Sequence, residues 1–348
     1  MRTSDFDYSL PQELIAQTPV EPRDNSSLMV LCRGGGDIEH RRFHEIGEYL
    51  GPGDVLVLNK SRVIPARLVG RRRSGGKVEV LLLRRLEPCL WEALVRPSNR
   101  VGVGEAITLA GGSALDWAAP QSREVQVLER REEGVRTVRF ADESLLQALG
   151  QVPLPPYIRA SLEDPERYQT VYGRENGSVA APTAGLHFTT KLLERLCSDG
   201  IGLAFVTLHV GLDTFRPVRV EDPWQHHIHS EYGEIDAAAV EVLASAKARG
   251  NRVICVGTTT VRLIEQAALA SRESGTLRPF KGPADLFILP GHHFRYTDCL
   301  VTNFHLPRTT LLMMVCAFAG RELIDRAYRE AIAAGYRFYS FGDAMLIL

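Results

Sequence analysis

The pattern of expected secondary structure changes twice along this chain, and this constrains the fold more than any other feature. Between residues 66 and 140, short apolar segments follow one another at hairpin spacing, with glycine-rich turns at 74–76 and 110–112 and no convincing helix. Such segments are typical of a small antiparallel β-barrel or sandwich. The strands expected here span 66–70, 78–83, 91–95, 106–109, 125–128 and 135–140.

Helices and strands alternate on both sides of this region. The expected helices span 43–50, 189–198, 237–248, 261–271, 310–319 and 322–333, and the expected strands span 29–32, 54–58, 202–208, 252–256 and 285–289. Strands separated by helices form βα crossovers and hence a largely parallel sheet. We therefore predict a discontinuous α/β domain from residues 1–65 and 153–348, with residues 66–152 inserted as a small antiparallel β-barrel domain.

The composition is that of a globular protein. Of the 348 residues, 45% are hydrophobic and 24% are charged, which suits about two domains. The longest apolar run, 311–319, is far shorter than the ~20 residues of a membrane span, and Asp5 and Asp7 stand where a signal peptide would be apolar. We expect a cytoplasmic protein without membrane attachment. The six cysteines include no C-x-x-C pair, so neither a zinc site nor a disulfide framework is indicated.

Polar residues follow the predicted strands of the α/β domain. Residues 209–211 (His-Val-Gly) come after the strand at 202–208, and residues 257–260 (Gly-Thr-Thr-Thr) come after the strand at 252–256. Ligands of open α/β sheets bind beyond the carboxyl ends of the strands. The turn at 257–260 leads into a helix, whose first amides and hydroxyls can hold a carboxylate or a ribose. An ordinary capped βα turn is the alternative.

Two further loops combine small or polar residues with a histidine. In residues 181–189, small residues surround His187 and allow a flat ligand to approach the backbone. In residues 302–310, polar side chains precede an apolar helix that Thr309 or Thr310 can cap. Each loop alone also fits a capped turn with a histidine satisfied in the core.

A histidine cluster at residues 226–229, followed by Glu231, invites a metal interpretation. In an extended segment, however, His227 and His229 share one face and His226 points to the other, unlike the i, i+4 spacing of helical zinc motifs. We favour acid/base catalysis or substrate hydrogen bonding and expect no metal. A metal-dependent hydrolase is the alternative.

One segment is strongly basic although the formal net charge is only −1. Residues 66–100 contain nine Lys or Arg against three Glu. Such a concentration of positive charge favours contact with a phosphate backbone. A merely solvated run of charges is the alternative.

Seven sequence blocks carry a family resemblance. They include DFDYSLP near the N-terminus (5–11), NKSRVIPAR (59–67), APTAGLHFT (181–189), LHVG (208–211), GTT (257–259), TNFHLP (302–307) and YSFGDAM (339–345). In this order they resemble S-adenosylmethionine:tRNA ribosyltransferase-isomerase, the QueA family, from the first residues to the last. The resemblance implies an α/β domain with an inserted β-barrel.

The resemblance also implies a reaction. The ribosyl part of S-adenosylmethionine moves onto the aminomethyl group of 7-aminomethyl-7-deazaguanine in the tRNA anticodon, without a metal. The products are epoxyqueuosine tRNA, adenine and methionine, and the step belongs to queuosine biosynthesis.

This chemistry requires a proton donor for the departing adenine, a base for the acidic C5′ proton beside the sulfonium, and an unprotonated amine. As the acid/base set with orienting carboxylates we nominate His187, His209, His229, His305, Asp343 and Glu231. For S-adenosylmethionine we nominate Thr183, Gly185, Gly211, Thr258, Thr259, Arg262, Thr302 and Asn303. For the anticodon stem-loop we nominate Arg62, Arg67, Arg71, Arg72, Arg73 and Lys77.

Some alternatives stay open at this stage. Arg262 suits the methionine carboxylate, but it also fits an exposed helix residue that pairs with Glu265. A non-catalytic RNA-binding adaptor, in which the α/β domain only supports the barrel, would use the same basic segment. We expect a monomer.

Overall fold

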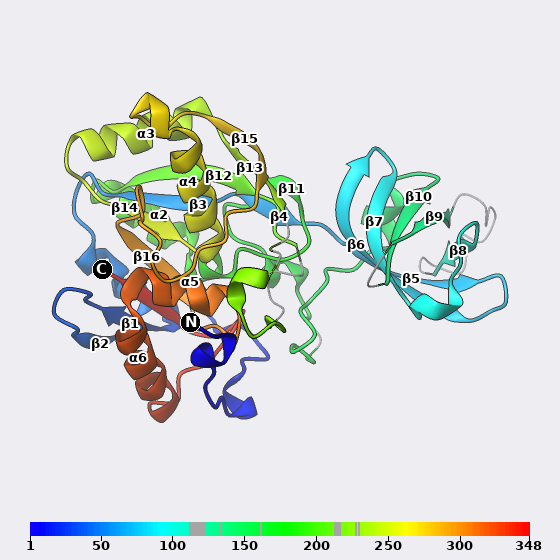
Figure 1. The fold of residues 1–348 in the computed structure, drawn as a ribbon, viewed down its shortest axis with the longest axis horizontal. Coiled ribbons are helices and arrows are strands. Elements are labelled where there is room, and N and C mark those ends of the chain that lie inside the picture. Colours follow the sequence, from blue (N-terminus) through cyan, green and yellow to red (C-terminus); the bar gives the residue numbers. More distant parts are fainter. Residues whose placement is uncertain (111–122, 132–133, 161, 212–216, 227, 229) are drawn as a thin grey trace. The chain divides into compact units, whose positions relative to one another are not determined.

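The structure is a computed structural model of residues 1–348, and it describes all of them except 111–122, 132–133, 161, 212–216, 227 and 229 (Figure 1). The described residues form two compact units. One consists of Met1–Arg62, Pro156–Glu175 and Ala181–Leu348, and the other of Val63–Pro155 and Asn176–Ala180.

The larger unit is built on a mixed sheet. Nine strands of the described chain lie in the order β15-β13-β12-β3-β14-β16-β17-β1-β2 (Figure 1). Their bounds are β1 Ser27–Leu31, β2 Ile38–Arg42, β3 Val55–Asn59, β12 Gly202–Leu208, β13 Glu231–Ile235, β14 Val253–Val256, β15 Phe280–Ala284, β16 Cys299–Asn303 and β17 Ala344–Ile347. The neighbours β12, β3, β14 and β16 are parallel to one another. Their carboxyl ends therefore meet at one edge of the sheet.

The two faces of this sheet are both buried. Val55 and Val57 of β3 belong to one apolar cluster, whereas Leu56 and Leu58 belong to a second. This separation follows from the alternation of side chains along a strand. It also explains why β3 reads as a continuous apolar run in the sequence, as expected for a strand covered on both faces.

Helices supply the apolar partners of both clusters. The helix α2 packs in the second cluster through Leu192 and Leu196, whereas α3 to α6 contribute to the first. Their bounds are α2 Thr190–Ser198, α3 Ala237–Ala248, α4 Thr258–Ala270, α5 Thr310–Ala319 and α6 Arg321–Ala333. Side chains of Thr189, Asp236 and Thr309 cap α2, α3 and α5 by accepting a hydrogen bond from a backbone amide of the first turn.

The smaller unit contains a closed antiparallel barrel. Among the described residues its strands follow the order β10-β7-β6-β5-β8-β9 (Figure 1). Alternate residues Trp91, Ala93 and Val95 of β7 are buried, as expected when one face of each strand points into a barrel. The bounds are β5 Arg67–Arg72, β6 Lys77–Glu87, β7 Leu90–Arg96, β8 Ala106–Leu109, β9 Glu124–Arg130 and β10 Val135–Phe140, followed by α1 Leu145–Leu149. The short strands β4 Ser61–Val63 and β11 Glu175–Ser178 pair with each other.

The predicted architecture, an α/β domain with an inserted antiparallel barrel, is confirmed. Parallel pairing is concentrated in the centre of the main sheet, and antiparallel pairs flank it.

The prediction of a strand at 285–289 is wrong. The strand β15 lies just before these residues, and the apolar Ile288 and Leu289 are buried in the core without joining the sheet. The segment Phe43–Tyr49 is helical, but of the 3₁₀ type. In the described part of the chain, all helices are too short or too polar to cross a bilayer.

Candidate active site

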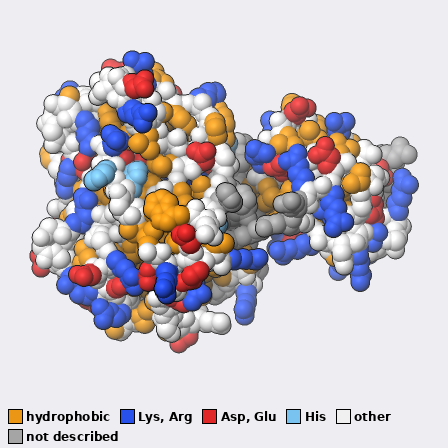
Figure 2. All heavy atoms as spheres, in the orientation of Figure 1, with side chains coloured by type: hydrophobic (Ala, Val, Ile, Leu, Met, Phe, Trp, Pro, Cys, Tyr) orange, Lys and Arg blue, Asp and Glu red, His pale blue; other side chains and the backbone are white. Residues whose placement is uncertain are grey.

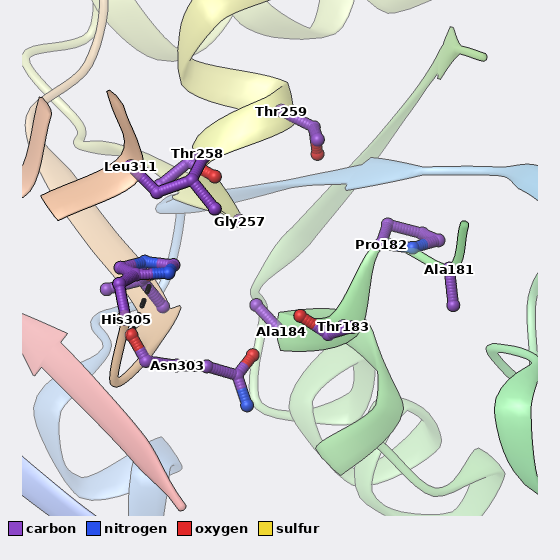
Figure 3. A pocket seen from close by; sticks show the side chains of 11 residues that line it. Ala181, Pro182, Thr183, Ala184, Gly257, Thr258, Thr259, Asn303, His305 and Leu311 are labelled. Atoms are coloured by element: carbon purple, nitrogen blue, oxygen red, sulfur yellow. Dashed lines mark hydrogen bonds between the residues drawn. The ribbon is translucent and has the colours of Figure 1, made fainter. Parts of the chain in front are cut away.

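A pocket lies at the edge of the main sheet where the parallel strands end. It is formed by residues 181–184, by the turn after β14, and by the end of β16 with the loop that follows, while Leu311 of α5 closes one side (Figure 3). Its empty volume is about 320 Å³, part of it open to solvent. The three loops singled out in the sequence therefore converge. The nominated residues that line the pocket are Thr183, Thr258, Thr259, Thr302, Asn303 and His305.

His305 is held rigidly at the pocket wall. Its Nε2 atom lies 2.8 Å from the Thr302 hydroxyl, and its backbone amide donates a hydrogen bond of 2.9 Å to the hydroxyl of Tyr328. Tyr8 donates a hydrogen bond to its backbone carbonyl. Burial lowers the pKa of His305 to about 3. The imidazole is therefore neutral near pH 7, so it is free to accept a proton, and its low pKa makes it a weak base.

His187 lies behind the pocket wall and contacts Asn303. Its Nδ1 atom is 2.7 Å from the Ser26 hydroxyl, its Nε2 atom is 3.1 Å from the amide nitrogen of Asn303, and its ring stacks on Phe43 with 4.9 Å between centroids. The Asn303 amide nitrogen also donates to the carbonyl of Tyr339 at 3.2 Å. Burial, followed by the charges of Arg337 and Arg23, lowers the pKa of His187 to about 3.

Two polar atoms at the pocket are buried and lack a hydrogen-bond partner among the described residues: Asn303 Oδ1 and Thr259 Oγ1. Buried polar atoms are rarely left unpaired in folded proteins. A bound ligand that supplies the missing partners is a direct explanation for both atoms.

A second cluster surrounds Glu231 at the start of β13. Its carboxylate forms an ion pair with Arg262 of α4, and both side chains are almost fully buried, at 5% and 6% exposure. The carboxylate also accepts a hydrogen bond of 2.7 Å from the backbone amide of Gly211. Burial lowers the pKa of Arg262 to about 10, which leaves the guanidinium charged at neutral pH. The alternative of an exposed Arg262 paired with Glu265 is wrong, because Glu265 instead accepts hydrogen bonds from the backbone amides of residues 295–297.

His209 lies at the end of β12, outside the pocket lining. Its ring stacks on that of Tyr232 with 5.7 Å between centroids and an angle of 20°. Burial lowers its pKa, against the opposing charges of Glu175 and Glu234. Its Nδ1 atom is buried without a hydrogen-bond partner in the described chain.

Asp343 and Gly185 also lie outside the pocket lining. Asp343 accepts hydrogen bonds from the backbone amides of Ser27, at 2.9 Å, and Arg337, at 2.7 Å, and burial raises its pKa. Gly185 serves close packing, because a Cβ atom there would lie 2.0 Å from the hydroxyl of Tyr172. The nominated His229 and its neighbour His227 lie outside the described residues. Within the described chain, no three His, Cys, Asp or Glu side chains are grouped to hold a metal ion.

Some of the basic residues nominated for tRNA form ion pairs with carboxylates, and others do not. On the barrel, Arg67 pairs with Glu79 and Arg72 with Glu105, both at 2.6 Å. Arg62 of the larger unit pairs with Glu166. Three exposed side chains of the β5–β6 hairpin have no carboxylate of the described residues within ion-pair distance: Arg71, Arg73 and Lys77. Figure 2 shows Lys and Arg side chains interspersed with Asp and Glu over the visible face of the barrel.

Sequence reasoning missed two residues that organise the pocket, Ser26 and Tyr339. Ser26 holds His187 from a position 161 residues away in the chain, and no local pattern marks it. Tyr339 adopts a left-handed backbone conformation with φ of 76°. Its block was noticed only through the family resemblance, because the relevant contact is made by its carbonyl and not by its side chain.

Known proteins resemble the chain over its whole length. A family model described as "Queuosine biosynthesis protein" matches residues 3–347. The S-adenosylmethionine:tRNA ribosyltransferase-isomerases of Symbiobacterium thermophilum and Dehalococcoides mccartyi are 55% and 54% identical, with 100% of each chain covered. A crystal structure of S-adenosylmethionine tRNA ribosyltransferase from Thermotoga maritima matches with a TM-score of 0.57 and 43% identity, covering 99% of this chain and 100% of that one. The chain therefore belongs to the queuosine biosynthesis family of S-adenosylmethionine:tRNA ribosyltransferase-isomerases.

Proposed function

We propose that this chain carries out the reaction implied by its family. It transfers and isomerises the ribosyl part of S-adenosylmethionine onto 7-aminomethyl-7-deazaguanine in the tRNA anticodon, with release of adenine and methionine. The observation that carries the proposal is the convergence of three family blocks on one pocket in which two buried polar atoms lack partners among the described residues. S-adenosylmethionine occupies this pocket as the co-substrate.

The start of α4 suits the methionine carboxylate. Gly257, with φ of 94°, turns the chain into this 13-residue helix, and the nearly buried Thr258 and Thr259 line the pocket at its first turn. The free amides and the dipole at a helix N-terminus favour an anion. Thr259 Oγ1 supplies the second observation, because this buried hydroxyl lacks a partner in the described chain. Arg262, one turn further along α4, neutralises Glu231 and does not itself take the carboxylate.

His305 is the base that we assign to the C5′ proton. It lines the pocket, and its neutral imidazole is anchored through Thr302. The neutral ring does not supply the proton that the departing adenine needs, so a different group performs that step. His209 and His229 are the candidates for this proton donor, and Glu231 fixes the backbone near His209 by accepting a hydrogen bond from the amide of Gly211.

A metal-free assay tests the reaction. Purified protein is mixed with S-adenosylmethionine and tRNA that carries 7-aminomethyl-7-deazaguanine, and adenine release and the mass of the tRNA nucleoside are followed. We expect one adenine released for each modified nucleoside, with or without a chelator. Binding of tRNA without adenine release would favour the RNA-binding adaptor, and loss of activity with a chelator would favour the metal-dependent alternative.

Replacement of His305 tests its role in the same assay. His305→Gln removes the base but keeps a polar side chain, so we expect turnover to fall by about 10²- to 10⁴-fold, the range of general acid/base contributions. The matched control is His293→Gln, which changes an exposed histidine and should leave turnover unaltered. Full activity of His305→Gln would exclude His305 as the base.

A further inference from the structure

The orientation of the Asn303 amide is fixed by a backbone carbonyl. The carbonyl of Tyr339 lies 3.2 Å from the amide nitrogen of Asn303 and also accepts a hydrogen bond of 2.9 Å from the amide of Gly342. A carbonyl can only accept, so the group that faces it must be the NH₂ of Asn303. The reverse orientation would place two acceptor oxygens against each other.

This orientation also determines the tautomer of His187. The second hydrogen of the Asn303 NH₂ points to His187 Nε2, at 3.1 Å. That nitrogen must therefore be the acceptor, so the proton of the neutral ring resides on Nδ1 and is donated to the Ser26 hydroxyl, at 2.7 Å. An imidazolium would turn two donors toward each other. The ring is fixed by stacking on Phe43 and by its burial.

The result is that the Asn303 side chain faces the pocket with one atom, Oδ1, that has no partner among the described residues. Both hydrogens of the Asn303 NH₂ are used, whereas Oδ1 is buried and has no partner among the described residues. In Figure 3 the amide oxygen of Asn303 points toward the pocket wall formed by Thr183 and Ala184, and its nitrogen points away. The pocket thus presents an acceptor here. A rotated amide would present a donor instead.

We propose that His187 is a positioning residue that holds the Asn303 amide with its oxygen toward the pocket, where it accepts an N–H or O–H of the adenosyl part of S-adenosylmethionine. The inference rests on the proposed function. The methionine carboxylate has no hydrogen to donate, so it is excluded at this position. Because the proposed function places the methionine part, with its ammonium group, at the start of α4, the adenine amino group and the ribose hydroxyls are the remaining donors of S-adenosylmethionine.

Two variants of His187 test this role. His187→Ala leaves one Asn303 hydrogen unpaired and frees the amide to rotate, so we expect about tenfold weaker S-adenosylmethionine binding, as for one lost buried hydrogen bond. His187→Gln restores an acceptor and should return the affinity to within about threefold of the wild type. Affinity is measured by titration calorimetry, and kcat, KM and the pH profile of kcat are measured in the adenine-release assay.

The measurements separate a positioning role from the other possibilities. Positioning predicts an increase in KM for His187→Ala, rescue by His187→Gln, and a pH profile of kcat that does not move. A hundredfold loss of kcat in His187→Gln at unchanged affinity would overturn the inference in favour of acid/base catalysis. Wild-type affinity in His187→Ala would also overturn it. If the wild-type protein itself binds no S-adenosylmethionine, the proposed function fails instead.

A second variant and a substrate analogue complete the test. If His187→Ala does not fold, as judged by circular dichroism, Ser26→Ala removes the acceptor of Nδ1–H and should weaken binding in the same direction, whereas unchanged affinity would overturn the inference. The analogue carries hypoxanthine in place of adenine. If the adenine amino group is the donor, the wild type binds the analogue less tightly than S-adenosylmethionine, whereas His187→Ala binds the two compounds with similar affinity. If a ribose hydroxyl is the donor, the relative loss is the same in both proteins.

Discussion

At the scale of single residues, burial keeps the pocket histidines neutral, and this has a consequence for stability. The pKa of His187 in the folded protein is about 3, below its ordinary value of 6.5. Between these values the unfolded chain binds a proton that the folded protein excludes, so the free energy of unfolding falls as the pH is lowered through 6.5. From pH 7 to pH 5 we expect a loss of about 2 kcal/mol from this one group.

Urea unfolding at pH 7 and pH 5 measures this contribution. In His187→Gln the decrease in stability between the two pH values should be smaller than in the wild type by about 2 kcal/mol. His293→Gln, at an exposed position, should show the wild-type decrease. An identical decrease in His187→Gln and the wild type would show that His187 is not buried as a neutral ring.

At the scale of the element, Thr309 caps helix α5, which contributes Leu311 to the pocket and Met313 to the core. The Thr309 hydroxyl accepts a hydrogen bond of 3.3 Å from the amide of Leu312 and donates one of 2.8 Å to the carbonyl of Leu306. Thr309→Ala removes both, and we expect a loss of about 1 to 2 kcal/mol in the free energy of unfolding. Thr309→Ser keeps the hydroxyl and should lose less. Equal losses in the two variants would assign the effect to the methyl group instead of the cap.

The helices and strands also show how much of the structure can be predicted from local sequence. The helices and the strands β1, β3, β12 and β14 were predicted because their apolar patterns are strong and helix caps such as Thr309 are local. The strands β16 and β17, in the middle of the main sheet, were not predicted. The edge strand β15 was misplaced because its residues, which include Pro283, lack strand preference and the sheet alone organises them. In the site, Asn303 and His305 were identified from their loop. The ion pair of Arg262 with Glu231 was not, because only the tertiary fold brings α4 and β13 together.

At the scale of the whole molecule, tRNA binding depends on which basic residues are available to phosphates. The pairs Arg67–Glu79 and Arg72–Glu105 already neutralise two of the nominated side chains. The remaining three on the β5–β6 hairpin are Arg71, Arg73 and Lys77, and we expect them to contact the tRNA backbone.

Each phosphate contact contributes about 0.7 to 0.9 to the slope of log K against log salt. The combined substitution of all three by Ala should therefore weaken tRNA binding and reduce this slope by about 2 to 3. Fluorescence anisotropy with labelled tRNA at several salt concentrations measures both quantities.

Arg67→Gln, which removes an already paired charge, is the matched control. It should change the slope by less than the contribution of one phosphate contact. The same slope in the triple variant and the wild type would exclude this hairpin from tRNA binding, and S-adenosylmethionine affinity, which depends on residues of the larger unit, should be unaffected in every case.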